Sequence, residues 1–243
     1  MINRKEDRRF EPPFFEVGPK AYLYGEEFVE LAKFADQLSK KYDVRIVATP
    51  QYVDIPIVAK ETENIFVFAQ HMDSLRPGRG LGSVLPEALK AAGADGTFLN
   101  HAEKRISIDE LEKTIPRAKE VGLMTIVCAD NMNEALFVAK LAPTLIVVES
   151  PDMIASGKKR DESEYDQIIE IEEKVHAINP EILLFHGAGI SNAQDVYDVI
   201  ASGAIGTGSS SALFLAEDRY KMLEDMIRSV HEAWTKNKKG ERK

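Results

Sequence analysis

The sequence contains a single cysteine, Cys128, among its 243 residues. It therefore cannot form an internal disulfide, and its folding cannot depend on an oxidising compartment. No stretch approaches the roughly 18 consecutive apolar residues of a membrane-spanning helix, and the charged first residues lack the apolar run of a signal peptide. We therefore expect a soluble protein of the cytoplasm that has no membrane partner.

Acidic residues outnumber basic ones, with 40 Asp and Glu against 31 Lys and Arg, a formal net charge of −9. This balance argues against a general affinity for nucleic acid, while a local basic pocket for a small anion stays open. The chain has no metal-ligand spacing and no Gly-x-Gly-x-x-Gly motif after its first strand, so we expect neither a metal nor a cofactor.

Short apolar strands alternate regularly with helical patterns along the chain. The expected strands are Phe14–Lys20, Val44–Ala48, Ile65–Ala69, Gly96–Leu99, Leu123–Ala129, Leu145–Val148, Ile182–Phe185 and Ala204–Gly208. The expected helices are Gly25–Tyr42, Tyr52–Glu61, Leu85–Ala92, Ile108–Val121, Asn133–Leu141, Tyr165–Ile178, Ala193–Ser202 and Arg219–Trp234. Such alternation is typical of an α/β protein, and eight units in this length favour a closed barrel over an open sheet.

No composition break or low-complexity linker divides this pattern, and the hydrophobic fraction of 44% is ample for one core. We therefore expect one (β/α)8 barrel domain over residues 14–235. A polar tail or lid, residues 1–13, would precede it, and a basic tail, residues 236–243, would follow it.

Polar residues stand where several of the expected strands end. The stretch Asp95–Glu103 is a short apolar run that ends in Asn-His-Ala-Glu, which places His101 at the carboxyl end of the fourth strand. Lys20 follows the first strand and Glu149 follows the sixth, while glycines and serines follow the seventh and eighth. Each has an ordinary structural explanation by itself. A barrel, however, gathers all its carboxyl strand ends on one face, so we expect these side chains to lie together.

These residue types fit proton transfer at a carbon next to a carbonyl group. A carboxylate can abstract the proton, while an imidazole and an ammonium group stabilise the enediolate that develops. Backbone N–H groups of residues 187–190 and 208–210 can hold a phosphate. The set therefore predicts an aldose–ketose isomerase that needs no metal and no redox cofactor.

Short segments spread over nearly the whole chain are specific in their order and spacing. They are Lys20-Ala21-Tyr22, Ala69-Gln70-His71-Met72-Asp73, Pro86-Glu87-Ala88, Asn100-His101-Ala102-Glu103, Gly122-Leu123, Val127-Cys128, Val148-Glu149-Ser150-Pro151 and Gly187-Ala188-Gly189-Ile190-Ser191. With them the chain resembles the triosephosphate isomerase family in its short archaeal form, whose fold is the (β/α)8 TIM barrel. That family is itself a standard example of a glutamate base, a neutral histidine and a closing loop.

The resemblance implies that Glu149 is the base, His101 the electrophile and Lys20 the ammonium group that attracts substrate charge, with Glu103 beside them. Residues 150–157 would form the closing loop. The residues expected to face the substrate phosphate are Gly157, Gly187, Gly189, Gly208 and Ser209. The resemblance further implies a small phosphorylated sugar as substrate, a role in glycolysis and gluconeogenesis, no cofactor, and a homodimer or homotetramer.

The chain departs from the family pattern most clearly at Gly18, where the family usually has Asn two residues before the lysine. Asn offers a donor and an acceptor, whereas Gly offers no side chain. The main interpretation is an enzyme that interconverts glyceraldehyde 3-phosphate and dihydroxyacetone phosphate. Two alternatives stay open: a paralogous isomerase of another small sugar phosphate, for which Gly18 makes room, and a non-catalytic barrel that binds a phosphorylated metabolite.

Overall fold

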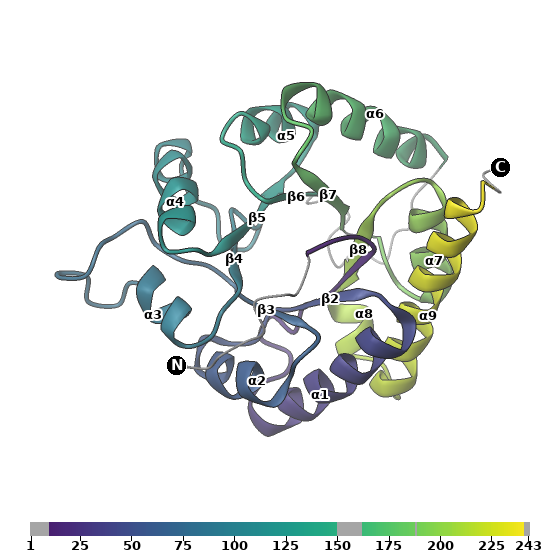
Figure 1. Ribbon diagram of the computed structural model, residues 1–243, viewed down its shortest axis with the longest axis horizontal. Coiled ribbons are helices and arrows are strands. Elements are labelled where there is room, and N and C mark those ends of the chain that lie inside the picture. Colours follow the sequence, from purple (N-terminus) through teal and green to yellow (C-terminus); the bar gives the residue numbers. More distant parts are fainter. Residues whose placement is uncertain (1–9, 150–161, 188, 241–243) are drawn as a thin grey trace.

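The computed structural model describes residues 10–149, 162–187 and 189–240, and within them eight parallel strands form one sheet. The strands are β1 (Phe14–Val17), β2 (Arg45–Ala48), β3 (Phe66–Ala69), β4 (Gly96–Leu99), β5 (Met124–Ala129), β6 (Leu145–Val148), β7 (Leu183–His186) and β8 (Gly206–Ser209). Each strand from β2 to β7 pairs with its predecessor in the chain, and β8 pairs with β1. Between the two remaining neighbours, β7 and β8, the Thr207 hydroxyl donates a hydrogen bond to the His186 carbonyl at 2.8 Å. The sheet thus curls into a nearly closed barrel, which confirms the predicted fold (Figure 1).

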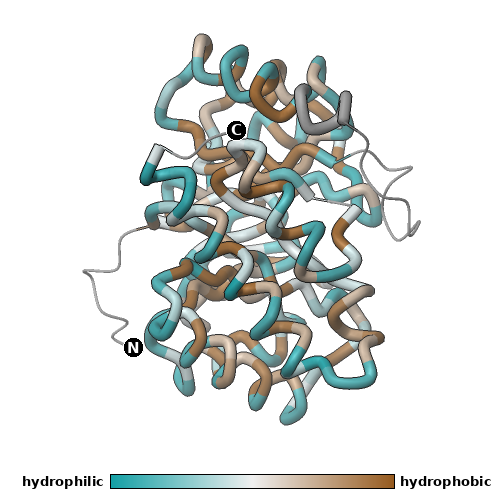
Figure 2. The backbone as a smooth tube through the Cα atoms, turned by 90° about the vertical axis from the view of Figure 1, so that its right-hand side faces the viewer, coloured by the Kyte–Doolittle hydropathy of each residue, from teal (hydrophilic) through white to brown (hydrophobic). Residues whose placement is uncertain are grey.

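Helices cover the outside of this barrel (Figure 1). They are α1 (Gly25–Tyr42), α2 (Ile55–Glu61) after the 3-10 turn η1 (Tyr52–Asp54), α3 (Pro86–Ala91), α4 (Ile108–Glu120), α5 (Met132–Ala139), α6 (Glu162–Ile178), α7 (Ala193–Ala201), α8 (Ser211–Phe214) and α9 (Arg219–Lys238). Hydrophobic and hydrophilic stretches follow one another along the helical coils that face the viewer in Figure 2. Within the described residues no helix is long and apolar enough to cross a membrane.

The structure differs from the sequence prediction mainly at the ends of elements. α8 was not predicted, because its four residues are too few to give a periodic signal. α9 continues to Lys238, so residues 236–238 of the expected basic tail are helical. No proline or glycine interrupts the helix before Gly240, which has a φ of 77°. Residues 1–9 and 241–243 of the two expected tails lie outside the described residues.

Phe10, within the expected N-terminal tail of residues 1–13, packs against the amino end of the barrel. Its ring centroid lies 4.5 Å from that of Phe14, 4.9 Å from that of Phe66 and 5.9 Å from that of Phe68. Phe10 therefore covers the face of the barrel opposite the carboxyl ends of the strands.

Alternate residues of each strand face the two sides of the sheet, which divides the core into two layers. The interior cluster consists of Phe14, Val47, Phe66, Phe68, Ile126, Cys128, Leu145, Val147 and Phe185. A larger cluster fills the space between the sheet and the helices. Cys128 is buried in the interior cluster, where it fits the role of a small core residue.

Candidate active site

A pocket of about 430 Å³ opens where the carboxyl ends of the strands meet. The predicted site residues that line it are Lys20, His101, Glu103, Glu149, Gly187, Gly189, Gly208 and Ser209. Gly157 and the expected closing loop, residues 150–157, lie outside the described residues. The structure thus brings together, in one concave site, every predicted site residue that it describes.

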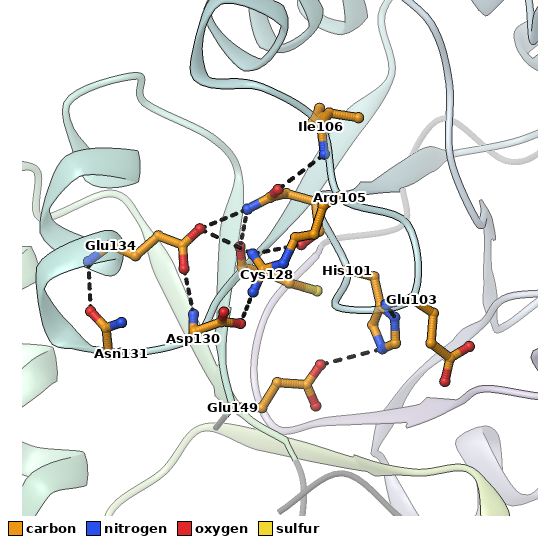
Figure 3. Close-up of polar contacts among 10 residues, drawn as sticks. His101, Glu103, Arg105, Ile106, Cys128, Asp130, Asn131, Glu134 and Glu149 are labelled. Atoms are coloured by element: carbon orange, nitrogen blue, oxygen red, sulfur yellow. Dashed lines mark hydrogen bonds and ion pairs between the residues drawn. The ribbon is translucent and has the colours of Figure 1, made fainter. Parts of the chain in front are cut away.

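His101 and Glu149 reach this pocket from β4 and β6. The Nε2 atom of His101 lies 3.4 Å from Oε1 of Glu149, and Figure 3 shows the imidazole pointing toward the carboxylate. On the other side of the ring, Nδ1 accepts a hydrogen bond from the Glu103 backbone N–H at 3.1 Å. Since Nδ1 is an acceptor, the ring proton of the neutral imidazole lies on Nε2, which faces the pocket.

Burial, and then the positive charge of Lys20, lower the pKa of His101 below its ordinary value. Both effects disfavour the imidazolium form. His101 is therefore a neutral hydrogen-bond donor near pH 7, which suits an electrophile that polarises a carbonyl oxygen.

A polar network fixes the loop that carries His101 (Figure 3). Asn100, with a φ of 60°, donates from Nδ2 to the Cys128 carbonyl at 3.1 Å and to Glu134 Oε1 at 2.9 Å. Arg105 donates to the Asn100 carbonyl at 3.2 Å and to Glu134 at 3.0 Å, and it pairs with Asp130. These contacts tie the loop after β4 to β5 and α5, so the position of the imidazole is determined by more than its own strand.

Lys20 is held in a left-handed backbone conformation with a φ of 48°. Two side-chain amides bind its carbonyl oxygen, from Gln51 at 2.6 Å and from Gln70 at 3.0 Å. Its Nζ donates to Glu103 Oε1 at 2.6 Å. A non-glycine residue in this region of φ is uncommon and persists only where its surroundings fix it. The contacts hold the ammonium group over the pocket.

Glu103 is the partner of that ammonium group. Burial disfavours its charged form, but the hydrogen bond and the charge of Lys20 outweigh burial and hold the pKa of Glu103 below its ordinary value. The Glu103 side chain is 60% exposed, so this ion pair contributes little to stability. Its effect is to orient Lys20.

Two of the predicted phosphate-facing glycines lie against carboxyl groups. A Cβ atom at Gly187 would lie 2.7 Å from Glu149 Oε2, and one at Gly208 would lie 2.9 Å from Glu16 Oε2. Real Cβ atoms do not approach so closely, so a larger residue at either position would displace the neighbouring carboxyl side chain. Gly189 has a φ of 67°, a conformation that glycine adopts without strain.

Comparison with known proteins agrees with this geometry. A sequence model of the family described as triosephosphate isomerase matches residues 19–230. The chain belongs to the triosephosphate isomerase family. Curated relatives named triosephosphate isomerase include that of Methanobacterium bryantii, 37% identical over 222 residues, which span 90% of this chain and 98% of the relative. That of Sulfolobus acidocaldarius is 34% identical over 227 residues, which span 93% of this chain and 98% of the relative.

Among solved structures, the triosephosphate isomerase of Bartonella henselae superposes with a TM-score of 0.74. The match has 16% sequence identity and covers 90% of this chain and 98% of that one. At this identity the likeness shows the shared barrel fold alone. The resemblance to the triosephosphate isomerase family drawn from the sequence is confirmed.

Sequence reasoning about this member of the triosephosphate isomerase family missed part of the pocket. Glu16, Thr49, Gln51 and Gln70 all line it and were not predicted. The two glutamines gave no usable signal, because an amide near a strand end is common. Glu16 did give one, since it is a lone charged residue in the apolar strand Phe-Phe-Glu-Val.

Proposed function

We propose that this member of the triosephosphate isomerase family interconverts glyceraldehyde 3-phosphate and dihydroxyacetone phosphate through an enediolate, with Glu149 as base, His101 as electrophile and Lys20 as the attracting cation. The observation that carries the proposal is the convergence of these three groups on one pocket, with His101 Nε2 3.4 Å from Glu149 Oε1. The archaeal relatives named triosephosphate isomerase support the choice of substrate.

The geometry supports a separate chemical role for each of the three groups, Glu149, His101 and Lys20. The Glu149 carboxylate takes the proton from the carbon next to the substrate carbonyl. His101 donates from Nε2 to the carbonyl oxygen, and the Lys20 ammonium group stabilises the negative charge that develops there. Glu149 then returns the proton to the former carbonyl carbon, while the hydroxyl proton of the substrate passes to the former carbonyl oxygen. The carbonyl group thus moves to the neighbouring carbon, and the aldose becomes the ketose. The backbone at Gly187, Gly189, Gly208 and Ser209 is proposed to hold the phosphate.

The proposal is tested by following the conversion of glyceraldehyde 3-phosphate by ¹H NMR with the purified protein. We expect dihydroxyacetone phosphate to form in a protein-dependent reaction. Turnover of a four- or five-carbon sugar phosphate instead would establish the paralogous isomerase. Binding of phosphorylated sugars with no turnover of any of them would establish the non-catalytic barrel.

The paralogous isomerase is favoured by one observation, the absence of a side chain at Gly18. The space beside Gly18 is not vacant, however, because the Glu16 carboxyl group occupies it. A larger substrate therefore gains no room there unless Glu16 moves, which favours the triose phosphates.

We further propose that the protein is a homo-oligomer. Tyr24 is 70% exposed and Val53 84% exposed, while Leu81 is fully exposed on the long connection between β3 and α3, which projects from the barrel (Figure 1). Apolar side chains on three neighbouring connections support a protein contact there. We expect light scattering to give a mass of two or more chains of 27.1 kDa each. A single 27.1 kDa species at micromolar concentration would contradict this.

A cytoplasmic location stays a prediction.

A further inference from the structure

Glu16 is a carboxyl group inside the barrel that the proposed mechanism does not use. It lies in β1, where Phe14 belongs to the interior cluster, while Phe15 and Val17 belong to the outer one. Because side chains alternate along a strand, Glu16 points inward with Phe14. It is partly buried and lines the same pocket as the candidate catalytic residues.

The Glu16 carboxyl group reaches up to the level of Gly18. A Cβ atom at Gly18 would meet Glu16 Oε1 first, and it would lie 2.7 Å from Oε2 and 2.9 Å from Cδ. Gly208 on β8 stands directly opposite Glu16 in the sheet register, and a Cβ atom there would lie 2.7 Å from Glu16 Cβ. The carboxyl group thus fills the volume of a side chain at position 18, and two glycines leave it room.

The candidate base is accommodated in the same way. Glu149 follows β6, and Gly187 follows the neighbouring β7, where a Cβ atom would lie 2.7 Å from Glu149 Oε2. Each carboxyl group therefore lies against a glycine that is in the adjacent strand or directly follows it, at the wall of one pocket. Glu16 is thus accommodated by a neighbouring glycine in the same way as Glu149.

We propose that the Glu16 carboxyl group is part of the substrate-binding surface and hydrogen-bonds an acceptor oxygen of the bound sugar phosphate, in the space that a side chain at position 18 would otherwise fill. Thr49 Oγ1 donates to Glu16 Oε1 at 2.9 Å, which orients the carboxyl group and leaves Oε2 for the ligand. The inference rests on the proposed function, since it takes the ligand to be a sugar phosphate.

The protonation state of Glu16 fits a donor. Burial is the main cause that raises the pKa of Glu16 to about 8; the charge of Glu149 raises it as well, while the Thr49 hydrogen bond and the charge of Lys20 lower it. Near pH 7 most of the group is therefore the neutral acid, with Oε1 accepting from Thr49 and a proton available on Oε2. A neutral acid also avoids repulsion with the substrate phosphate.

Above pH 8 Glu16 becomes a carboxylate and loses this donor. The titratable groups that face it are Lys20 after β1, Cys128 on β5 and Glu149 after β6. Burial raises the pKa of the Cys128 thiol well above its usual value, so this group stays neutral in the same range. We therefore expect the activity to fall between pH 8 and 9, in part because Glu16 ionises in this range.

The test compares Glu16→Leu, Glu16→Gln and the wild type on glyceraldehyde 3-phosphate. Leu fills the space without a polar group, and we expect it to lower kcat/KM roughly 10-fold at pH 7, as for the loss of one hydrogen bond to a charged ligand. Gln keeps a donor and an acceptor but cannot ionise. We expect it to stay within about 3-fold of the wild type at pH 7 and to be less affected between pH 8 and 9.

Unfolding temperatures separate this role from a structural one. Because the folded state holds Glu16 at a pKa of about 8 against an ordinary 4.5, its burial destabilises the fold increasingly as pH rises from 4.5 to 8. Glu16→Gln should therefore raise the unfolding temperature at pH 8 and change it little at pH 4.5. Glu30→Gln on the exposed face of α1 is the control, with no expected effect on kinetics.

Two results would overturn the inference: wild-type kcat/KM in Glu16→Leu, or an equal loss of kcat/KM in Glu16→Gln and Glu16→Leu.

A second variant guards against misfolding of the first. Glu16→Ala combined with Gly18→Asn moves the polar group to the other position, and it should recover part of the activity that Glu16→Ala loses. A wild type that turns over no triose phosphate would instead contradict the proposed function, so the two failures are distinguishable.

Discussion

Replacing Glu149 by Gln is expected to lower kcat for triose phosphate isomerisation by about 10²- to 10⁴-fold, the usual contribution of a positioned general base. The amide has nearly the same shape, but it cannot accept the substrate proton. We expect KM to change only a few-fold, because the contacts proposed for the phosphate are left intact. Steady-state kinetics at pH 7 measure both quantities.

Glu149→Asp provides a graded version of this test. Aspartate keeps the carboxylate but withdraws it by about one methylene, and a displacement near 1 Å can cost about 100-fold in rate. Glu170→Gln is a matched control, since Glu170 pairs with Lys174 on the exposed side of α6. Wild-type kcat in Glu149→Gln would remove Glu149 from the mechanism.

Lys20→Met is expected to lower kcat/KM by about 10²- to 10³-fold, comparable to the loss of one preorganised group that stabilises transition-state charge. Methionine keeps the length of the side chain and removes its charge. It also removes the charge that helps to keep His101 neutral, so the pKa of His101 should rise. A pH profile of kcat/KM should accordingly show its acid limb moved to higher pH.

The control for this prediction is Lys33→Met, because Lys33 forms a comparable ion pair with Glu30 at 2.8 Å on α1 and does not line the pocket. We expect its kinetics to match the wild type. The free energy of unfolding should change by less than about 1 kcal/mol in both variants, since exposed ion pairs contribute little. Equal kcat/KM in Lys20→Met and the wild type would contradict the role given to the ammonium group.

The barrel and three of its strand-end residues could be predicted because the strands and the polar residues that follow them are visible as local patterns in the sequence. Most of the strands are short apolar runs followed by polar residues, so Lys20, His101 and Glu149 stand out by position alone. The barrel rule then places strand ends on one face without any knowledge of contacts. That reasoning fixes which residues meet, but it gives no distance between them.

Glu16 could not be assigned in this way. Its place in an apolar strand shows only that it faces one side of the sheet, and alternation does not say how far its carboxyl group extends along the barrel. That depends on Gly18 above it and on Gly208, which stands opposite it although 192 positions later in the chain. The same limit applies to the amides that hold Lys20, because Gln51 and Gln70 reach its carbonyl from other strand ends.

The most direct test of the central claim, proton abstraction by Glu149 beside a neutral His101, is the isomerisation of glyceraldehyde 3-phosphate in D₂O followed by ¹H NMR. The wild type should form dihydroxyacetone phosphate, and part of it should carry solvent deuterium on the carbon that gains the proton, because the proton held by Glu149 can exchange with the solvent before it is returned. Glu149→Gln should form the product at most at 1% of the wild-type rate. Equal rates of product formation, or of deuterium incorporation, by Glu149→Gln and the wild type would contradict the mechanism.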